Sequence, residues 1–215
     1  MNLEFDSERK YLVSSLKRTG YIKSNAVEQA FLKIPREDFV PNSMKSLAYM
    51  DKPLEIGEGQ TISAPHMVAI MCEALDIQKG QTILEIGAGS GYHAAIVSKI
   101  VGTTGHIYSV ERIQSLVKYA EENLKTVGIT NVTVIGGDGS EGLEEYAPYD
   151  RIYVTCAAPI VPQPLLDQLK NPGKLLIPVG NMYCELRRID KEGSEITERN
   201  FGGCVFVPLI GKYGH

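Results

Sequence analysis

The stretch LEIGAGSG, residues Leu84 to Gly91, decides the fold that this chain is expected to adopt. It follows a short apolar run and precedes a helical pattern, so a buried strand is predicted to pass through three glycines into a helix. Glycine lacks a Cβ atom, which lets the chain turn sharply and lets a ligand approach the backbone. In an open parallel sheet, ligands bind at the carboxyl ends of strands. We therefore predict a binding loop at Gly87, Gly89 and Gly91.

The spacing of these glycines bears on which cofactor the loop would hold. Dinucleotide sites favour the pattern GxGxxG, with a pyrophosphate over the start of the helix. Here the pattern is GxGxG, and the bulky Tyr92 stands where close helix packing favours a small residue. Taken alone, the loop is also compatible with a tight strand-to-helix turn that binds nothing. Tyr92 itself either closes over a cofactor or packs in the core.

Two further signals follow the next two predicted strands. Glu111 ends the strand at 106–110, about 20 residues past the loop, where a carboxylate can accept two hydrogen bonds from ribose hydroxyls. Asp138, in the run Gly136–Gly139, can accept from the exocyclic amine of adenine, while Gly139 lets the backbone approach a planar ring. Each acid alone is equally compatible with a solvated strand end or a turn. Together with the glycine loop, they predict a nucleoside-containing cofactor, with S-adenosylmethionine favoured over NAD.

The chain after residue 80 alternates strand and helix patterns, and this predicts an α/β fold with a doubly wound, mostly parallel sheet. Strands are expected at 82–86, 106–110, 132–135, 151–155 and 174–177, and helices at 91–101, 113–124 and 165–169. The runs 185–190 and 194–199 flank turn residues and predict a hairpin. A last strand is expected at 204–209, so the C-terminal edge is predicted to be antiparallel.

The first 80 residues have a different texture and predict an N-terminal helical region. Helices are expected at 7–19, from Asn25 to a stop at Pro35, and after Ser63, which is predicted to be an N-cap with Pro65 in the first turn. Residues 51–60 are predicted to form a loop. We expect residues 1–215 to form a single methyltransferase domain, with a substrate-side region at 1–80 and a cofactor-binding core at 81–215.

Composition and charge exclude several classes of function. A net charge of -4 argues against a nucleic-acid partner held by a basic surface. The four cysteines show no CxxC or Cys/His pattern for a metal, and Cys72 and Cys156 are expected to be buried, reduced thiols. The N-terminus does not resemble a secretory signal, and no apolar run is long enough to span a membrane. A cytoplasmic protein without metal, nucleic-acid or membrane partners is expected, and a monomer.

The sequence resembles one family, the protein L-isoaspartate O-methyltransferases, which are Rossmann-like enzymes that use S-adenosylmethionine. The most specific resemblance is the stretch Gly59–Met67, with the sequence GQTISAPHM. Other matching stretches cover nearly the whole chain: Ile34–Pro41, Leu84–Tyr92, Gly137–Gly139, Ala147–Asp150, Ala157–Pro159, Gln168–Lys170, Ile177–Gly180 and Phe206–Leu209. Two positions depart from the family: Cys156 stands where many relatives have alanine, and Ile210 where some carry a hydroxyl residue.

The resemblance implies methyl transfer to the α-carboxylate of L-isoaspartyl residues in damaged peptides and proteins. The ester then closes to a succinimide, which hydrolyses partly to normal aspartate. The resemblance makes Ser63 the active-site residue, places Thr61 and Ile62 in the same wall, and has His66 assist at the substrate or cofactor. It also implies that Glu85 and the glycines surround the amino-acid part of S-adenosylmethionine.

The chemistry suits these residues, although other readings of them stay open. A carboxylate is ionised at neutral pH and needs no strong base, so proximity and alignment should dominate catalysis. Ser63 is alternatively only a helix cap, and His66 only a first-turn residue; His93 is expected to pack rather than react. Rival functions are a methyltransferase acting on RNA or a small molecule, and a non-catalytic module that keeps the cofactor pocket.

Overall fold

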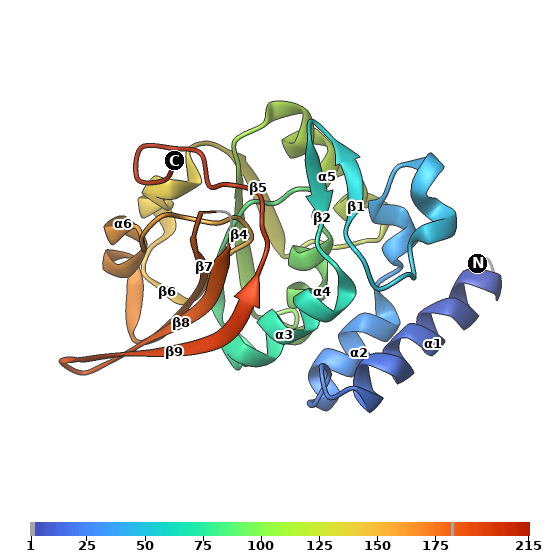
Figure 1. Cartoon of the computed structure of the whole chain (residues 1–215), viewed down its shortest axis with the longest axis horizontal. Helices are drawn as coiled ribbons and strands as arrows, with labels where there is room; N and C mark the ends of the chain where they lie inside the picture. Colours follow the sequence, from blue (N-terminus) through green and yellow to red (C-terminus); the bar gives the residue numbers. More distant parts are fainter. Residues whose placement is uncertain (1–2, 182) are drawn as a thin grey trace.

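Seven strands form one sheet in the computed structural model, which describes residues 3–181 and 183–215 (Figure 1). Their order across the sheet is β5-β4-β3-β6-β7-β8-β9. The bounds are β3 (Thr82–Ile86), β4 (His106–Glu111), β5 (Val132–Gly136), β6 (Tyr149–Val154), β7 (Leu169–Gly180), β8 (Cys184–Glu192) and β9 (Glu195–Cys204). The strands from β5 to β7 are parallel, and β8 and β9 are antiparallel. The predicted mostly parallel sheet with an antiparallel C-terminal edge is confirmed.

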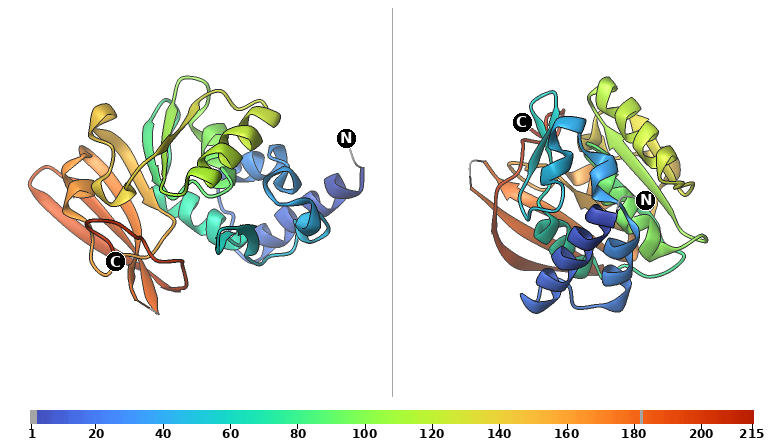
Figure 2. Two further views of the ribbon diagram at one scale, coloured as in Figure 1. Left: turned by 90° about the horizontal axis from the view of Figure 1, so that it is seen from above. Right: turned by 90° about the vertical axis from the view of Figure 1, so that its right-hand side faces the viewer.

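Helices cover both faces of this sheet. The α-helices are α1 (Leu3–Arg18), α2 (Asn25–Lys33), α3 (Pro65–Leu75), α4 (Tyr92–Val101), α5 (Gln114–Thr126) and α6 (Gln163–Asp167). The short 3₁₀ helices are η1 (Arg36–Phe39), η2 (Asn42–Leu47), η3 (Gly139–Glu141) and η4 (Glu144–Tyr146). Helices α1 and α2 lie at the opposite end of the molecule from the β8–β9 hairpin (Figure 2). Within residues 3–181 and 183–215, every helix is too short or too polar to span a membrane.

Alternation along the strands explains the two layers, because successive side chains of a strand point to opposite faces. In β3, Ile83 joins the hydrophobic cluster that contains α4, whereas Leu84 and Ile86 join the cluster that contains α6. The first cluster also includes Phe31 of α2 together with Ile96 of α4. The N-terminal helices therefore share a hydrophobic core with the α/β part of the chain.

The order of the strands creates the place where a ligand can bind. From β3 the chain moves outward to β4 and β5, and it then returns to β6 on the other side of β3. Where successive connections diverge in this way, a crevice opens at the carboxyl ends of the strands. The register pairs Ile86 with both Val110 of β4 and Val154 of β6. The loops that follow these three strands therefore converge at the carboxyl ends of the central strands.

A two-stranded hairpin lies over the carboxyl ends of these strands, formed by β1 (Leu54–Gly57) and β2 (Gln60–Ile62). The prediction of a plain loop at 51–60 was wrong, because the turn residues Gly57, Glu58 and Gly59 dominate its composition. All three adopt positive φ angles, of 95°, 55° and 68°. A Cβ atom added to Gly89 would lie 3.4 Å from Cδ1 of Ile56, so the hairpin packs directly on the glycine loop.

The end of the chain also differs from the prediction. The hairpin at 185–199 is confirmed as β8 and β9, but β9 ends at Cys204 and no separate strand follows among the described residues. Instead, an isolated bridge joins Pro208 to Ala157, just beyond β6. Ala157 N–H donates to the carbonyl of Val207 at 2.8 Å, and Leu209 N–H donates to the carbonyl of Ala157 at 2.7 Å. The segment is therefore anchored beside the convergent loops.

Candidate active site

The glycine loop after β3 is shaped by contacts that only glycine permits. Gly87, Gly89 and Gly91 have φ angles of 94°, 54° and 84°, which L-residues with a Cβ adopt at a cost. A Cβ atom on Gly87 would lie 2.3 Å from the hydroxyl oxygen of Thr155. That hydroxyl donates to the carbonyl oxygens of Ile86, at 3.0 Å, and of Gly87, at 2.7 Å. The glycine loop therefore packs against the end of β6, and its backbone faces the place where the loops after β3, β4 and β6 meet.

Glu111 ends β4 beside this loop and is only 8% exposed. Its Oε2 accepts from the N–H of Gly89 at 3.0 Å, and its Oε1 accepts from the N–H of Ile113 at 2.9 Å. A carboxylate oxygen has two lone pairs, so each can accept one more hydrogen bond. The fixed carboxylate can therefore grip a pair of neighbouring hydroxyl groups while holding the glycine loop in place.

Ser63 lies between β2 and α3, and its role as an N-cap was predicted wrongly. Pro65 occupies the first helical position, so the N-cap is Ala64, which forms no side-chain cap. The start of the helix is served from a distance, because Oδ1 of Asp51 accepts from the N–H of His66 at 2.8 Å. Ser63 is consequently not used to cap α3, and it lies on the wall of the cavity described next.

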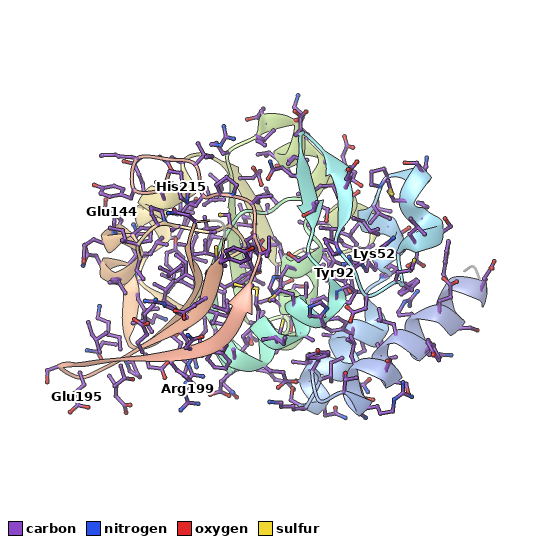
Figure 3. The ribbon with its side chains drawn as sticks, viewed as in Figure 1. Lys52, Tyr92, Glu144, Glu195, Arg199 and His215 are labelled. Atoms are coloured by element: carbon purple, nitrogen blue, oxygen red, sulfur yellow. The ribbon has the colours of Figure 1, made fainter. Side chains whose placement is uncertain are left out.

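One cavity joins these features, with an empty volume of about 920 Å³ that includes open solvent at its mouth. Its lining comes from the glycine loop, the ends of β4 and β6, the segment after β9 and the stretch Gln60–Ser63. Tyr92, at the start of α4, forms part of the wall and is labelled in Figure 3. It is 3% exposed and packs edge-on against Phe31 and Phe39.

Comparison with known proteins agrees with this geometry. The family model described as Protein-L-isoaspartate(D-aspartate) O-methyltransferase matches residues 7–214. The chain belongs to this family.

Relatives and solved structures of the family resemble the chain over nearly its whole length. The protein-L-isoaspartate O-methyltransferase of Methanothermobacter thermautotrophicus is 54% identical over 210 residues, which covers 96% of this chain and 97% of that protein. A solved protein-L-isoaspartate O-methyltransferase superposes with a TM-score of 0.88 at 34% identity, covering 96% of this chain and 67% of that one. A candidate enzyme of the same name from Plasmodium falciparum, in complex with S-adenosyl-L-homocysteine, has a TM-score of 0.85 at 28% identity, covering 94% and 98%.

The fold brings together most of the residues that the sequence suggested for the site. The cavity is lined by seven of them: Thr61, Ile62, Ser63, Gly87, Gly89, Glu111 and Gly139. The two positions that depart from the family, Cys156 and Ile210, also line it. Sequence reasoning missed Thr155, whose only signal was its place at the end of the strand that neighbours β3. It also missed the contribution of Arg112 and Ile113, which flank Glu111.

Four suggested residues, Glu85, Gly91, Asp138 and His66, lie outside the lining of the cavity. His66 is turned toward Asp51, whose Oδ1 lies 2.9 Å from its Nδ1. Gly91 is the N-cap of α4 and packs against α5, since a Cβ there would lie 3.2 Å from Cγ of Leu124.

Asp138 holds the C-terminal segment. Its Oδ1 accepts from the N–H and the hydroxyl of Ser140, at 2.9 and 2.7 Å, and its Oδ2 accepts from the N–H of Lys212 at 2.8 Å. Burial opposes ionisation of Asp138, but these hydrogen bonds outweigh it, and the pKa of the carboxyl lies below its usual value. Asp138 therefore ties the last residues to the loop after β5, next to Gly139.

Glu85 is buried beneath the glycine loop on the face of the sheet that α4 covers. Its oxygens accept from Tyr153, at 2.9 Å, and from Ser109. Burial raises the pKa of Glu85 to about 8, although both hydrogen bonds oppose the rise. Beside it, the His93 ring packs against the Tyr153 ring at a tilt of 40°, with centroids 4.4 Å apart, and burial lowers the pKa of His93 to about 3. His93 is thus a neutral packing residue, as expected, although it also reaches the cavity wall.

The raised pKa of Glu85 predicts a specific dependence of stability on pH. The folded chain keeps the Glu85 proton up to about pH 8, whereas the unfolded chain releases it near 4.5. The group's stabilising contribution is therefore complete below the unfolded value and is lost as the pH rises through the folded one, at no more than about 1.4 kcal/mol per pH unit. Glu85→Gln resembles the protonated acid and should remove this slope.

Urea unfolding of the two proteins from about pH 5 to about pH 8 measures the difference in slope. Glu195→Gln, at the exposed start of β9, serves as the control and should keep the wild-type slope. Parallel curves for wild type and Glu85→Gln would show that Glu85 is ionised in the folded state.

The remaining chemistry of the site is simple. Cys156 is buried, and burial raises the pKa of its thiol, so it presents a neutral S–H group to the cavity. Cys72 is likewise a free, buried thiol, as predicted. Within residues 3–181 and 183–215, no three His, Cys, Asp or Glu side chains cluster as a metal site would require.

Proposed function

We propose that this chain transfers a methyl group from S-adenosylmethionine to the α-carboxylate of L-isoaspartyl residues in peptides and proteins, which begins their repair. Membership of the family supports the reaction. The observation that carries the proposal is the position of Ser63 on the wall of the same cavity as Glu111 and the glycine loop.

The cavity residues fit a nucleoside cofactor with an amino-acid tail. The backbone at Gly87 and Gly89 is open to the cavity, and the fixed Glu111 carboxylate can accept from two ribose hydroxyls. Gly139 lines the cavity and lets the loop after β5 pack directly on β3, because a Cβ there would lie 2.4 Å from Cγ2 of Ile86. When bound, S-adenosylmethionine supplies an electrophilic methyl group on a sulfonium. Four residues outside the cavity lining are proposed to stabilise the loops and the helix start that form it: Glu85, Gly91, Asp138 and His66.

Ser63 is proposed to position the substrate. An α-carboxylate is already ionised at neutral pH, so the chain has only to hold it and orient its lone pairs. One neutral hydroxyl can do so without drawing off the negative charge that makes the oxygen nucleophilic. Thr61 and Ile62, beside Ser63 in the wall, would contact the neighbouring atoms of the peptide.

The test of the reaction compares two peptides that differ only in the linkage of one residue. Labelled methyl transfer to an isoaspartyl peptide is expected, with a base-labile product, and none to its aspartyl twin. Transfer to RNA or to a small molecule, with no transfer to the isoaspartyl peptide, would overturn the proposal.

Ser63→Ala is expected to lower turnover of the isoaspartyl peptide by roughly 10-fold, the scale of one lost hydrogen bond to a charged group, about 1.5 kcal/mol. Affinity for S-adenosylhomocysteine, measured by calorimetry, should stay close to wild type, because Glu111 and the glycines are untouched. Ser194→Ala, at the exposed turn between β8 and β9, controls for loss of a hydroxyl. Full turnover by Ser63→Ala would rule out the positioning role.

A further inference from the structure

Arg36 is completely buried directly behind Ser63. Its Nε donates to the carbonyl of Ala48 at 2.9 Å, and its Nη2 donates to the carbonyl of Ser63 at 2.9 Å. The third nitrogen, Nη1, is buried and has no hydrogen-bond partner among the described residues. The backbone of Arg36 is itself anchored, because its N–H donates to the hydroxyl of Tyr49 at 3.2 Å. Arg36 thus links η1 to the cavity wall across 27 residues of sequence.

The charge of Arg36 lacks a paired carboxylate within the described part of the chain, where every ion pair involves other residues. Burial lowers the pKa of Arg36, whereas the Tyr92 side chain and, more weakly, Asp51 favour the charged guanidinium. However, Oδ1 of Asp51 already serves the N–H and ring of His66. The face of the Tyr92 ring, 4.8 Å from Cζ of Arg36, offers partial compensation. Burying a cation without an ion-pair partner costs folding free energy, which suggests that the charge of Arg36 has a function.

Both groups that Arg36 contacts on the cavity side, Ser63 and Tyr92, line the cavity. We propose that Arg36 is a positioning residue that fixes Ser63, and that its unpaired charge favours substrates carrying a carboxylate at Ser63. The inference rests on the proposed function and adds to it a determinant of substrate charge. Lying behind a carbonyl and an aromatic ring, the guanidinium attracts an anion without bonding to its oxygens. The lone pairs needed for methyl transfer therefore stay free.

The two roles of Arg36 can be separated by substitution. Arg36→Lys keeps the charge, but a single ammonium lacks the planar fork that reaches both Ala48 and Ser63. It should lower the rate constant for methyl transfer while preserving the preference for anionic peptides. Arg36→Met removes both the charge and the fork, and should lose the preference as well.

The preference is measured as a ratio of two dissociation constants, in the presence of S-adenosylhomocysteine so that no turnover occurs. One peptide carries isoaspartate, and its partner carries isoasparagine, whose α-carboxamide has the same shape without the charge. We expect the wild type to favour the carboxylate by at least about 10-fold, and Arg36→Met to bring the ratio close to one. A change of fold alone would weaken the binding of both peptides and leave the ratio of their dissociation constants unchanged. Arg18→Met, which removes an exposed arginine at the end of α1, is the control and should keep the wild-type ratio.

Each outcome decides something. If Arg36→Met retains the wild-type ratio, the role of the charge is wrong, and if Arg36→Lys retains the wild-type rate, the role in positioning Ser63 is wrong. Should Arg36→Met not fold, Arg36→Gln keeps an N–H donor without the charge and supports the same comparison. Failure of the wild type itself to methylate the isoaspartyl peptide would instead count against the proposed function, so the two failures are distinguishable.

Discussion

Gly87→Ala is expected to destabilise the folded chain by about 2–3 kcal/mol and to weaken cofactor binding. Two costs add. A residue with a Cβ at positive φ costs roughly 1–2 kcal/mol relative to glycine, and Gly87 has a φ of 94°. The new Cβ would also lie 2.3 Å from the Thr155 hydroxyl oxygen. That hydroxyl must then move and give up the hydrogen bond that its single proton shares between the carbonyls of Ile86 and Gly87, worth about 1 kcal/mol.

Two comparisons separate these costs. Gly128→Ala has a φ of 69° but open space around its Cβ, so it should show the backbone cost alone. In the double variant Gly87→Ala/Thr155→Ala the clash is relieved, because the next nearest atom other than Thr155 is Sγ of Cys156 at 3.8 Å. Urea unfolding and calorimetry with S-adenosylhomocysteine measure both effects. Equal losses of unfolding free energy for Gly87→Ala and Gly128→Ala would show that Gly87 does not pack tightly against Thr155.

The sequence predicted those parts of the fold that local pattern controls. The alternation of strands and helices fixes the parallel sheet, and the glycine spacing fixes the loop after β3. Pro65 could have corrected the prediction at Ser63, since proline favours the first helical position and so makes Ala64 the N-cap. The turn at Gly57–Gly59 hid the β1–β2 hairpin, because three consecutive turn residues leave only short strands on either side.

The parts that the sequence did not predict depend on partners far apart in the chain. Asp51 serves the start of α3 from 15 residues away, and Arg36 reaches the carbonyl of Ser63 across 27. Asp138 bonds to the N–H of Lys212, 74 residues later. An acid at a strand end has the same local pattern whether it faces a ligand or a distant backbone N–H. Only the fold distinguishes Glu111, which lines the cavity, from Asp138, which does not.

Glu111→Gln is expected to weaken binding of S-adenosylhomocysteine by roughly 10- to 150-fold, the range for hydrogen bonds to a charged group. The substitution removes the negative charge and replaces one acceptor oxygen by an NH₂ donor. That donor would face the N–H of either Gly89 or Ile113, each of which now donates to a carboxylate oxygen. The variant therefore loosens the glycine loop and loses one acceptor for ribose at the same time.

A ligand with fewer hydroxyl groups separates these two losses. The 2′-deoxy form of S-adenosylhomocysteine should bind wild type more weakly than the parent compound, whereas Glu111→Gln should discriminate much less between the two. Glu122→Gln, exposed on α5, is the matched control and should bind both ligands as the wild type does. Because the cycle compares differences, a general loosening of the loop cancels, and only contact between residue 111 and the ribose contributes. If Glu111→Gln discriminates between the two ligands as strongly as wild type does, the ribose does not contact residue 111. The expected orientation of the cofactor across the ends of β3, β4 and β5 would then be wrong.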